Sequence, residues 1–185
     1  LIGKDMFAID GCKLPSNASK EWSGTKEEFK RKVQKMEKAI KGIVEKHRMT
    51  DKTETGNVVR EKEEKYIKTL QDQVKKIREW LKNNEDKIGK SGKPIKSNIT
   101  DNESAKLKTS KGVIQGYNGV TVVDSKSQVI VAAEAFGQGN ERELLKPMLE
   151  EVEKNFKAIG EDEVLKKAKV TADSGFHSEA NLKML

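Results

Sequence analysis

Two aspartates, Asp10 and Asp173, are the side chains of this sequence whose type and setting best suit chemistry. Each ends a short apolar run typical of a β-strand, at residues 6–9 and 169–172, and each has a glycine close behind. Neighbouring strands that end in carboxylates bring together negative charges, which is unfavourable unless a divalent cation neutralises them. Oxygen-only ligands favour Mg²⁺ or Mn²⁺ over zinc. Taken singly, each aspartate also fits a turn, because Asp-Gly is a common turn pair.

The elements that would position these aspartates follow an α/β pattern. The expected order is a strand at 6–9, a helical segment at 25–84, strands at 112–123 and 128–135, a helix capped by Asn140, a strand at 169–172 and a helix capped by Ser178. Residues 83–111 are rich in Asn, Lys, Gly and Ser and are expected to form a loop. Asp124 is a rival second carboxylate, but its Ser-Lys-Ser neighbours indicate a hairpin turn.

The helical segment carries two heptad seams. The first consists of Phe29, Val33, Met36, Ile40, Ile43 and His47, and the second of Ile67, Leu70, Val74, Ile77 and Leu81. Thr25 and Glu28 form a capping box at the start of the first helix. The polar residues 50–57 between the seams let the chain reverse. The pattern therefore predicts an antiparallel, coiled-coil-like helical hairpin inserted after the first strand.

Charge is distributed unevenly along the 185 residues, whose net charge is +7. Residues 20–96 hold 23 Lys and Arg against 14 Asp and Glu, whereas the remainder is slightly acidic. With 34% apolar and 36% charged residues, one compact core with a solvated element fits better than two full cores. A single cysteine, Cys12, excludes an intramolecular disulfide and a Cys-based zinc site. No apolar stretch is long enough to span a membrane.

Several blocks, in this order, resemble the DDE class of bacterial insertion-sequence transposases. They are residues 7–20, 100–108, 112–118, 129–134 and 171–178. The resemblance implies an RNase H-like mixed sheet, formed here by residues 1–20 and 97–185, with residues 21–96 as a basic helical hairpin and loop. It also implies that Asp10 and Asp173 are the catalytic and metal-binding aspartates and hold two divalent cations, Mg²⁺ or Mn²⁺.

The family's third carboxylate lies in a Tyr-x2-Arg-x3-Glu-x6-Lys block that nothing up to Leu185 matches. Glu179 is too close to Asp173 to replace it, and Glu134 ends an internal strand. His177 is expected to be an exposed residue at a helix start rather than a metal ligand. We therefore expect a fragment of a longer protein, inactive by itself because its third carboxylate is missing.

The implied reaction is two-metal cleavage of DNA at transposon ends, followed by strand transfer into target DNA. The residues expected to contact DNA are Lys13, Asn17, Ser19, Lys20, Tyr117 and Asn118. Tyr117 and Asn118 lie between glycines, where a β-bulge would fit equally well, and Asp101 is expected to be a solvated loop residue. The basic hairpin is a candidate for tracking the phosphate backbone, since a protein that holds DNA needs positive charge.

We further expect a homodimer in the active complex, no membrane partner, and a bacterial cytoplasmic, nucleoid-associated location. Two alternatives remain open. One is an RNase H-like nuclease that cuts DNA without joining it. The other is a non-enzymatic coiled-coil module, in which the hairpin binds protein and the α/β part anchors it; that module would need neither aspartate for its function.

Overall fold

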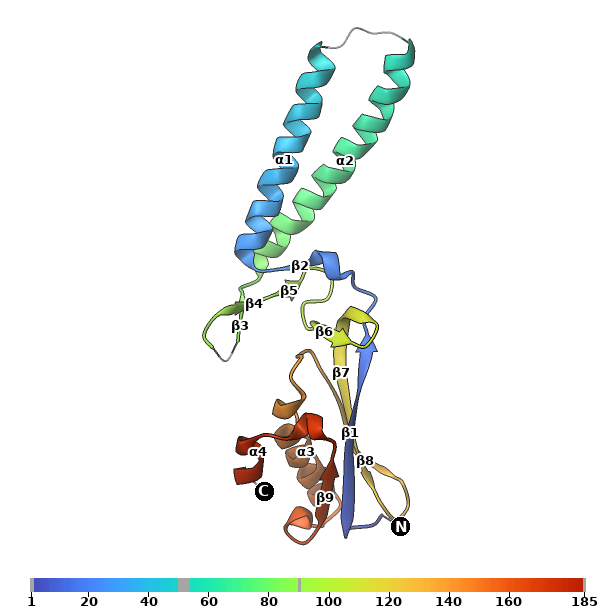
Figure 1. Ribbon diagram of the computed structural model, residues 1–185, viewed down its shortest axis with the longest axis vertical. Coiled ribbons are helices and arrows are strands. Elements are labelled where there is room, and N and C mark those ends of the chain that lie inside the picture. The colour runs from blue at the N-terminus through green and yellow to red at the C-terminus, as the bar shows by residue number, and fades with distance from the viewer. Residues whose placement is uncertain (1, 50–53, 90, 185) are drawn as a thin grey trace. The chain divides into compact units, whose positions relative to one another are not determined.

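The computed structural model describes residues 2–49, 54–89 and 91–184 (Figure 1). The chain divides into two compact units, one formed by Leu1–Glu21 with Thr100–Leu185 and the other by Trp22–Ile99. The α-helices are α1 (Lys26–Met49), α2 (Glu54–Asn83), α3 (Leu145–Ala158) and α4 (Glu179–Met184). The strands are β1 (Met6–Pro15), β2 (Ser23–Gly24), β3 (Lys87–Ile88), β4 (Pro94–Ile95), β5 (Ser97–Asn98), β6 (Ala105–Thr109), β7 (Gly112–Asp124), β8 (Ile130–Phe136) and β9 (Lys169–Ala172). The 3₁₀-helices are η1 (Lys20–Trp22), η2 (Glu141–Glu143), η3 (Val164–Lys166) and η4 (Ser174–Phe176).

The first unit is built on a five-stranded mixed sheet in which β1 lies between β7 and β9. β1 pairs antiparallel with β7 and parallel with β9, where Ile9 lies opposite Ala172. The long strand β7 also pairs antiparallel with β6 near its start and with β8 near its end. The expected mixed α/β class is confirmed by this arrangement.

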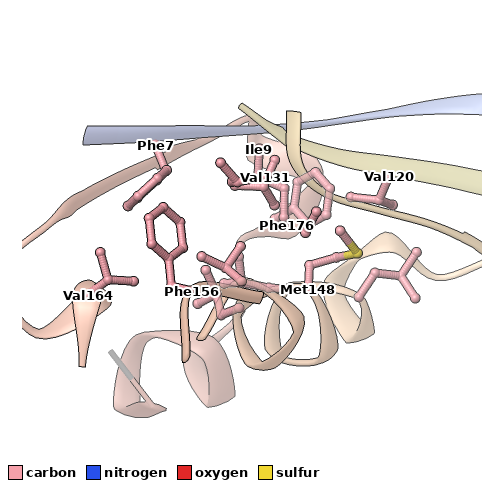
Figure 2. Packing of buried hydrophobic residues seen from close by; sticks show 14 residues of the cluster. Phe7, Ile9, Val120, Val131, Met148, Phe156, Val164 and Phe176 are labelled. Atoms are coloured by element: carbon pink, nitrogen blue, oxygen red, sulfur yellow. The ribbon is translucent and has the colours of Figure 1, made fainter. Parts of the chain in front are cut away.

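One face of the sheet packs against α3 and forms the core of this unit (Figure 2). Side chains alternate along a strand, so Phe7 and Ile9 of β1 point into this core and are buried. The Phe7 ring meets the Phe156 ring of α3 edge-on, with centroids 5.7 Å apart. The same alternation places Ala8 and Asp10, both exposed, on the opposite face. The core face thus fixes the orientation of β1, and with it the face on which Asp10 lies.

Asp124 organises the turn between β7 and β8. Its buried carboxylate accepts hydrogen bonds from the backbone N–H groups of Gly3 (3.1 Å), Lys126 (2.9 Å), Ser127 (2.8 Å) and Val129 (2.9 Å). The hydrogen bond from Ser127 is the main reason that the pKa of Asp124 is lowered, although burial opposes the shift. The hairpin-turn role expected for Asp124 is therefore confirmed.

The second unit centres on α1 and α2, which run antiparallel and pack along their heptad seams. Phe29 and Val33 of α1 are buried against Ile77 and Trp80 of α2, and the rings of Phe29 and Trp80 lie 5.0 Å apart. Nearer the far ends of the helices, seam residues such as Ile40 are only half-buried. No helix within residues 2–49, 54–89 and 91–184 has the length and apolar character needed to cross a membrane.

The capping box at the start of α1 is confirmed. The Thr25 N–H donates to Glu28 Oε2 (2.9 Å), and the Glu28 N–H donates to Thr25 Oγ1 (3.3 Å). The predicted cap at Asn140 is wrong, because Asn140 precedes η2 and α3 begins only at Leu145. The Asn140 side chain instead donates to the Glu143 carboxylate (3.0 Å), so its polar group serves the short turn before the helix.

The segment predicted as a loop at residues 83–111 contains four strands, β3 to β6. Three of them have only two residues, and such short strands have no period that a sequence pattern can reveal. The predicted break at residues 50–57 overlaps α2, which begins at Glu54. The rest of that break, residues 50–53, lies outside the described residues.

We predict that Asp124→Asn destabilises the protein most near neutral pH. The folded-state pKa of Asp124 is depressed, so its stabilisation is full above the unfolded value of about 3.9 and is lost as pH falls through the folded value. Urea unfolding of parent and variant over a pH series measures the difference. Asp162→Asn, at an exposed position, is the control. If the difference in free energy of unfolding between the parent and Asp124→Asn stays the same at acid pH, this role of Asp124 is contradicted.

Candidate active site

The parallel pairing of β1 with β9 brings Asp10 and Asp173 to one edge of the sheet. Ile9 lies opposite Ala172 in this ladder, and the aspartates are the next residues on the two chains. Asp173 keeps an extended backbone, with φ −71° and ψ 171°. Since paired strands lie about 4.8 Å apart, the two aspartates start from neighbouring backbone positions.

Each aspartate is oriented by a backbone N–H group close by in sequence. Asp10 Oδ1 accepts a hydrogen bond from the Gly11 N–H (2.7 Å), and Asp173 Oδ1 accepts one from the Gly175 N–H (2.7 Å). The second contact makes Asp173 the N-cap of η4. Both side chains are exposed, and a carboxylate offers about four lone-pair sites. Each can therefore accept further ligands while keeping its backbone hydrogen bond.

A third carboxylate, that of Glu141, lies beside the Asp173 turn and was missed by sequence reasoning. A Cβ atom added to Gly175 would lie 2.7 Å from Glu141 Oε2 and 2.8 Å from Asp173 Oδ1. Both carboxylates therefore lie next to this glycine. Glu141 Oε1 also forms an ion pair with Lys13 Nζ at 3.3 Å. Lys13, a candidate for DNA contact, is thus held next to the Asp173 turn.

The contact between η2 and η4 depends on a buried amide, that of Asn181 in α4. Its Nδ2 donates to the carbonyl oxygens of Arg142 (2.8 Å) and Phe176 (2.6 Å), one from each 3₁₀-helix. This bridge keeps Glu141 next to Asp173. The sequence carries no local signal for it, because its partners are joined only through the fold of α4 against both turns.

The donor chemistry of this edge suits a hard divalent cation. Asp10 and Asp173 offer only oxygen ligands, which Mg²⁺ and Mn²⁺ prefer. Within residues 2–49, 54–89 and 91–184, no group of three or more His, Cys, Asp or Glu side chains is arranged to hold a metal ion. In those ranges, no third side chain of these types is therefore arranged with Asp10 and Asp173 to hold a metal ion, and His177 is exposed as expected.

The remaining candidates for DNA contact differ in how exposed they are. Asn17, Ser19 and Lys20 are exposed in the segment that follows β1. Asn118 is only 1% exposed, and its Nδ2 donates to the Gln138 carbonyl oxygen (2.6 Å). Its position within β7 therefore makes it part of the packing of this unit.

Tyr117 and Asp101 belong to one hydrogen-bond network. Asp101 Oδ1 accepts from the Tyr117 hydroxyl (2.6 Å), and its Oδ2 accepts from the Ser16 hydroxyl (2.6 Å). Partial burial opposes ionisation, yet these bonds hold the pKa of Asp101 below its usual value. The prediction of a solvated Asp101 is wrong for this reason. Of the two alternatives for Tyr117 and Asn118, the β-bulge is not formed, because the register shift of β7 lies between Val122 and Val123.

We predict that Asp101→Asn lowers the pKa of Tyr117. The hydrogen bond to the ionised Asp101, together with partial burial, raises the pKa of Tyr117 to about 12. Removing the negative charge should return this value toward the ordinary one of about 10. Tyrosinate absorbance measures the titration, and Tyr117→Phe identifies which of the two tyrosines gives each signal. An unchanged titration in Asp101→Asn would contradict the assigned hydrogen bond.

A comparison with known proteins identifies the family of this chain. A family model described as Transposase DDE domain matches residues 92–185, about half of the chain, including β6 to β9 and Asp173. Asp10 lies before the matched region and joins it through the pairing of β1 with β7 and β9. No curated protein and no solved structure matches the chain. The chain belongs to the transposase DDE domain family.

Proposed function

We propose that this chain is part of the catalytic domain of a DNA transposase. In this domain, Asp10 and Asp173 bind divalent cations and support cleavage of transposon ends and strand transfer. The observation that carries the proposal is the β1–β9 ladder, which continues on both strands into an aspartate. The family match supports the same activity. Oxygen ligands, exposure and proximity are what a Mg²⁺ or Mn²⁺ site requires.

The strand order supports an RNase H-like architecture for the first unit. When β6 is left aside, the sheet strands in chain order are β1, β7, β8 and β9, and the first and fourth of these are neighbours that run parallel. The resemblance implies the same placement, with the first catalytic aspartate on the first strand and the second on the fourth. β6 adds a further strand beside β7.

The roles of the chain's own residues follow from their contacts. When bound, paired divalent cations activate a water or 3′-hydroxyl and stabilise the leaving oxygen of a phosphodiester. Asp10 and Asp173 would bind these cations through the oxygens that their backbone hydrogen bonds orient. Lys13, held by Glu141, would bind a neighbouring phosphate. An RNase H-like nuclease would share the site, and a strand-transfer assay with the complete transposase distinguishes it.

The helical hairpin is proposed to contribute to DNA binding through one of its sides. Lys32 of α1 and Lys76 of α2 both lie over the Trp22 ring, 4.5 and 5.5 Å from its centre, so they mark a common side. In the heptad pattern this side comprises the c and g positions, to which Lys35 and Lys62 also belong. Between residues 29–49 and 59–83 these positions hold no Asp or Glu. A uniformly basic side suits the phosphate backbone.

We predict that Asp10→Asn and Asp173→Asn each weaken Mn²⁺ binding by at least about tenfold, because each removes a charged ligand. Isothermal titration with MnCl₂ measures the affinity, and Asp162→Asn, exposed on the same unit, is the control. Circular dichroism verifies that the variants fold. Equal Mn²⁺ affinity in the parent and both aspartate variants would contradict the proposed metal site.

We predict that Lys35→Gln with Lys62→Gln reduces the salt dependence of DNA binding. If both lysines contact phosphates, the slope of log K against log salt concentration flattens by about 0.9 for each, or roughly 2 together. Fluorescence anisotropy with a labelled duplex measures the slope. The control is Lys68→Gln with Lys82→Gln, which removes the same charge from b positions of α2. Equal slopes for the two double variants would contradict a basic binding side.

A further inference from the structure

The hairpin has a second side, whose charges are mixed instead of only basic. A groove of about 660 Å³ runs along it between α1 and α2, with Ile40 and Val74 of the heptad seams among its lining residues. Ile40 is only half-buried there. A pair of helices covers one side of each apolar stripe, whereas a four-helix arrangement encloses the stripes completely. This groove is therefore an incompletely covered apolar seam.

The charges on the rim of this groove are ordered along its length. Glu37 and Lys41 line it from α1, and Glu79 and Lys75 line it from α2. Within each pair the residues are one helical turn apart, about 6 Å along the axis. Because the helices are antiparallel, both place the acidic residue nearer the end of the hairpin that holds Lys26 and the lysine nearer the opposite end.

An ion pair joins the two helices across the groove. Arg78 of α2 donates to Glu37 of α1 at 2.5 Å, which sets the two helices in register at the acidic end. Lys75 and Glu79, the other charged residues of α2 on this rim, are both exposed. With Glu37 paired to Arg78, the rim keeps an acidic position at Glu79 and a basic position at Lys75, one helical turn apart.

From this arrangement we propose that the groove is the docking surface for the same groove of a second copy of the chain. A two-fold axis perpendicular to the hairpin would turn one copy end over end, so that Glu79 of one meets Lys75 of the other, and the reverse. Such an isologous contact is the commonest form of homodimer. The apolar seam residues of both copies would then complete a four-helix layer.

The size of the hairpin face is adequate for such a contact. The 24 residues of α1 extend for about 36 Å, and two adjacent helices are about 20 Å wide. A flat face of these dimensions is on the order of 700 Å², close to the roughly 800 Å² that each partner buries in a standard interface.

DNA is a poorer occupant of this groove. Its lining mixes acidic Glu37 and Glu79 with the basic Lys41, Lys75 and Arg78, whereas the side with Lys35 and Lys62 holds only basic charge at its c and g positions. The two sides of the hairpin thus suit two different partners. Because the groove lies wholly within the hairpin, a monomeric protein would leave the proposed metal site untouched, and loss of the metal site would leave the dimer untouched.

Charge reversal with rescue tests the proposed interface. The parent chain should dimerise in sedimentation-velocity experiments at concentrations up to about 100 μM. Lys75→Glu and Glu79→Lys should each weaken the dimer at least about tenfold, because each places like charges opposite each other twice in a symmetric contact. An equimolar mixture of the two variants should form the dimer again, since one chain is then basic where the other is acidic.

Controls separate this result from loss of folding or binding of DNA. Lys62→Glu, on the opposite side of α2, should leave the dimer affinity unchanged, and circular dichroism should show equal helix content in all variants. A monomeric parent, a dimer insensitive to both reversals, or a mixture that fails to associate would each overturn the proposal. So would a parent that associates only when duplex DNA is added.

Discussion

The parallel pairing of β1 with β9 is the contact on which the account of this protein depends. Residues separated by most of the chain become neighbours there, and the register that sets Ile9 opposite Ala172 leads directly to Asp10 and Asp173. A shift of one residue on either strand would turn one aspartate toward the core. The buried Phe7 and Ile9 prevent such a shift, because exposing them would cost the contacts with α3.

Much of this arrangement could be predicted from the sequence. Apolar runs at residues 6–9 and 169–172 located the two strands, the heptad seams located α1 and α2, and the Asp124 turn followed from its Ser-Lys-Ser neighbours. These features succeed because periodicity and turn chemistry are local. The resemblance to transposases supplied the pairing of the aspartates, which no local pattern contains.

What the sequence did not reveal depends on contacts between distant segments. Glu141 reaches the Asp173 turn only because Asn181 joins η2 to η4, and Asp101 is withdrawn from solvent only because Ser16 and Tyr117 converge on it. The short strands β3 to β5 were missed because two residues carry no period. In each case the deciding partner lies far away in the chain.

The central claim is that Asp10 and Asp173 hold a divalent cation together. Anomalous diffraction from crystals grown with Mn²⁺ tests it most directly. The account predicts an anomalous peak within about 2.2 Å of a carboxylate oxygen from each aspartate. Well-ordered carboxylates with no peak between them, or a peak held by other residues alone, would contradict it.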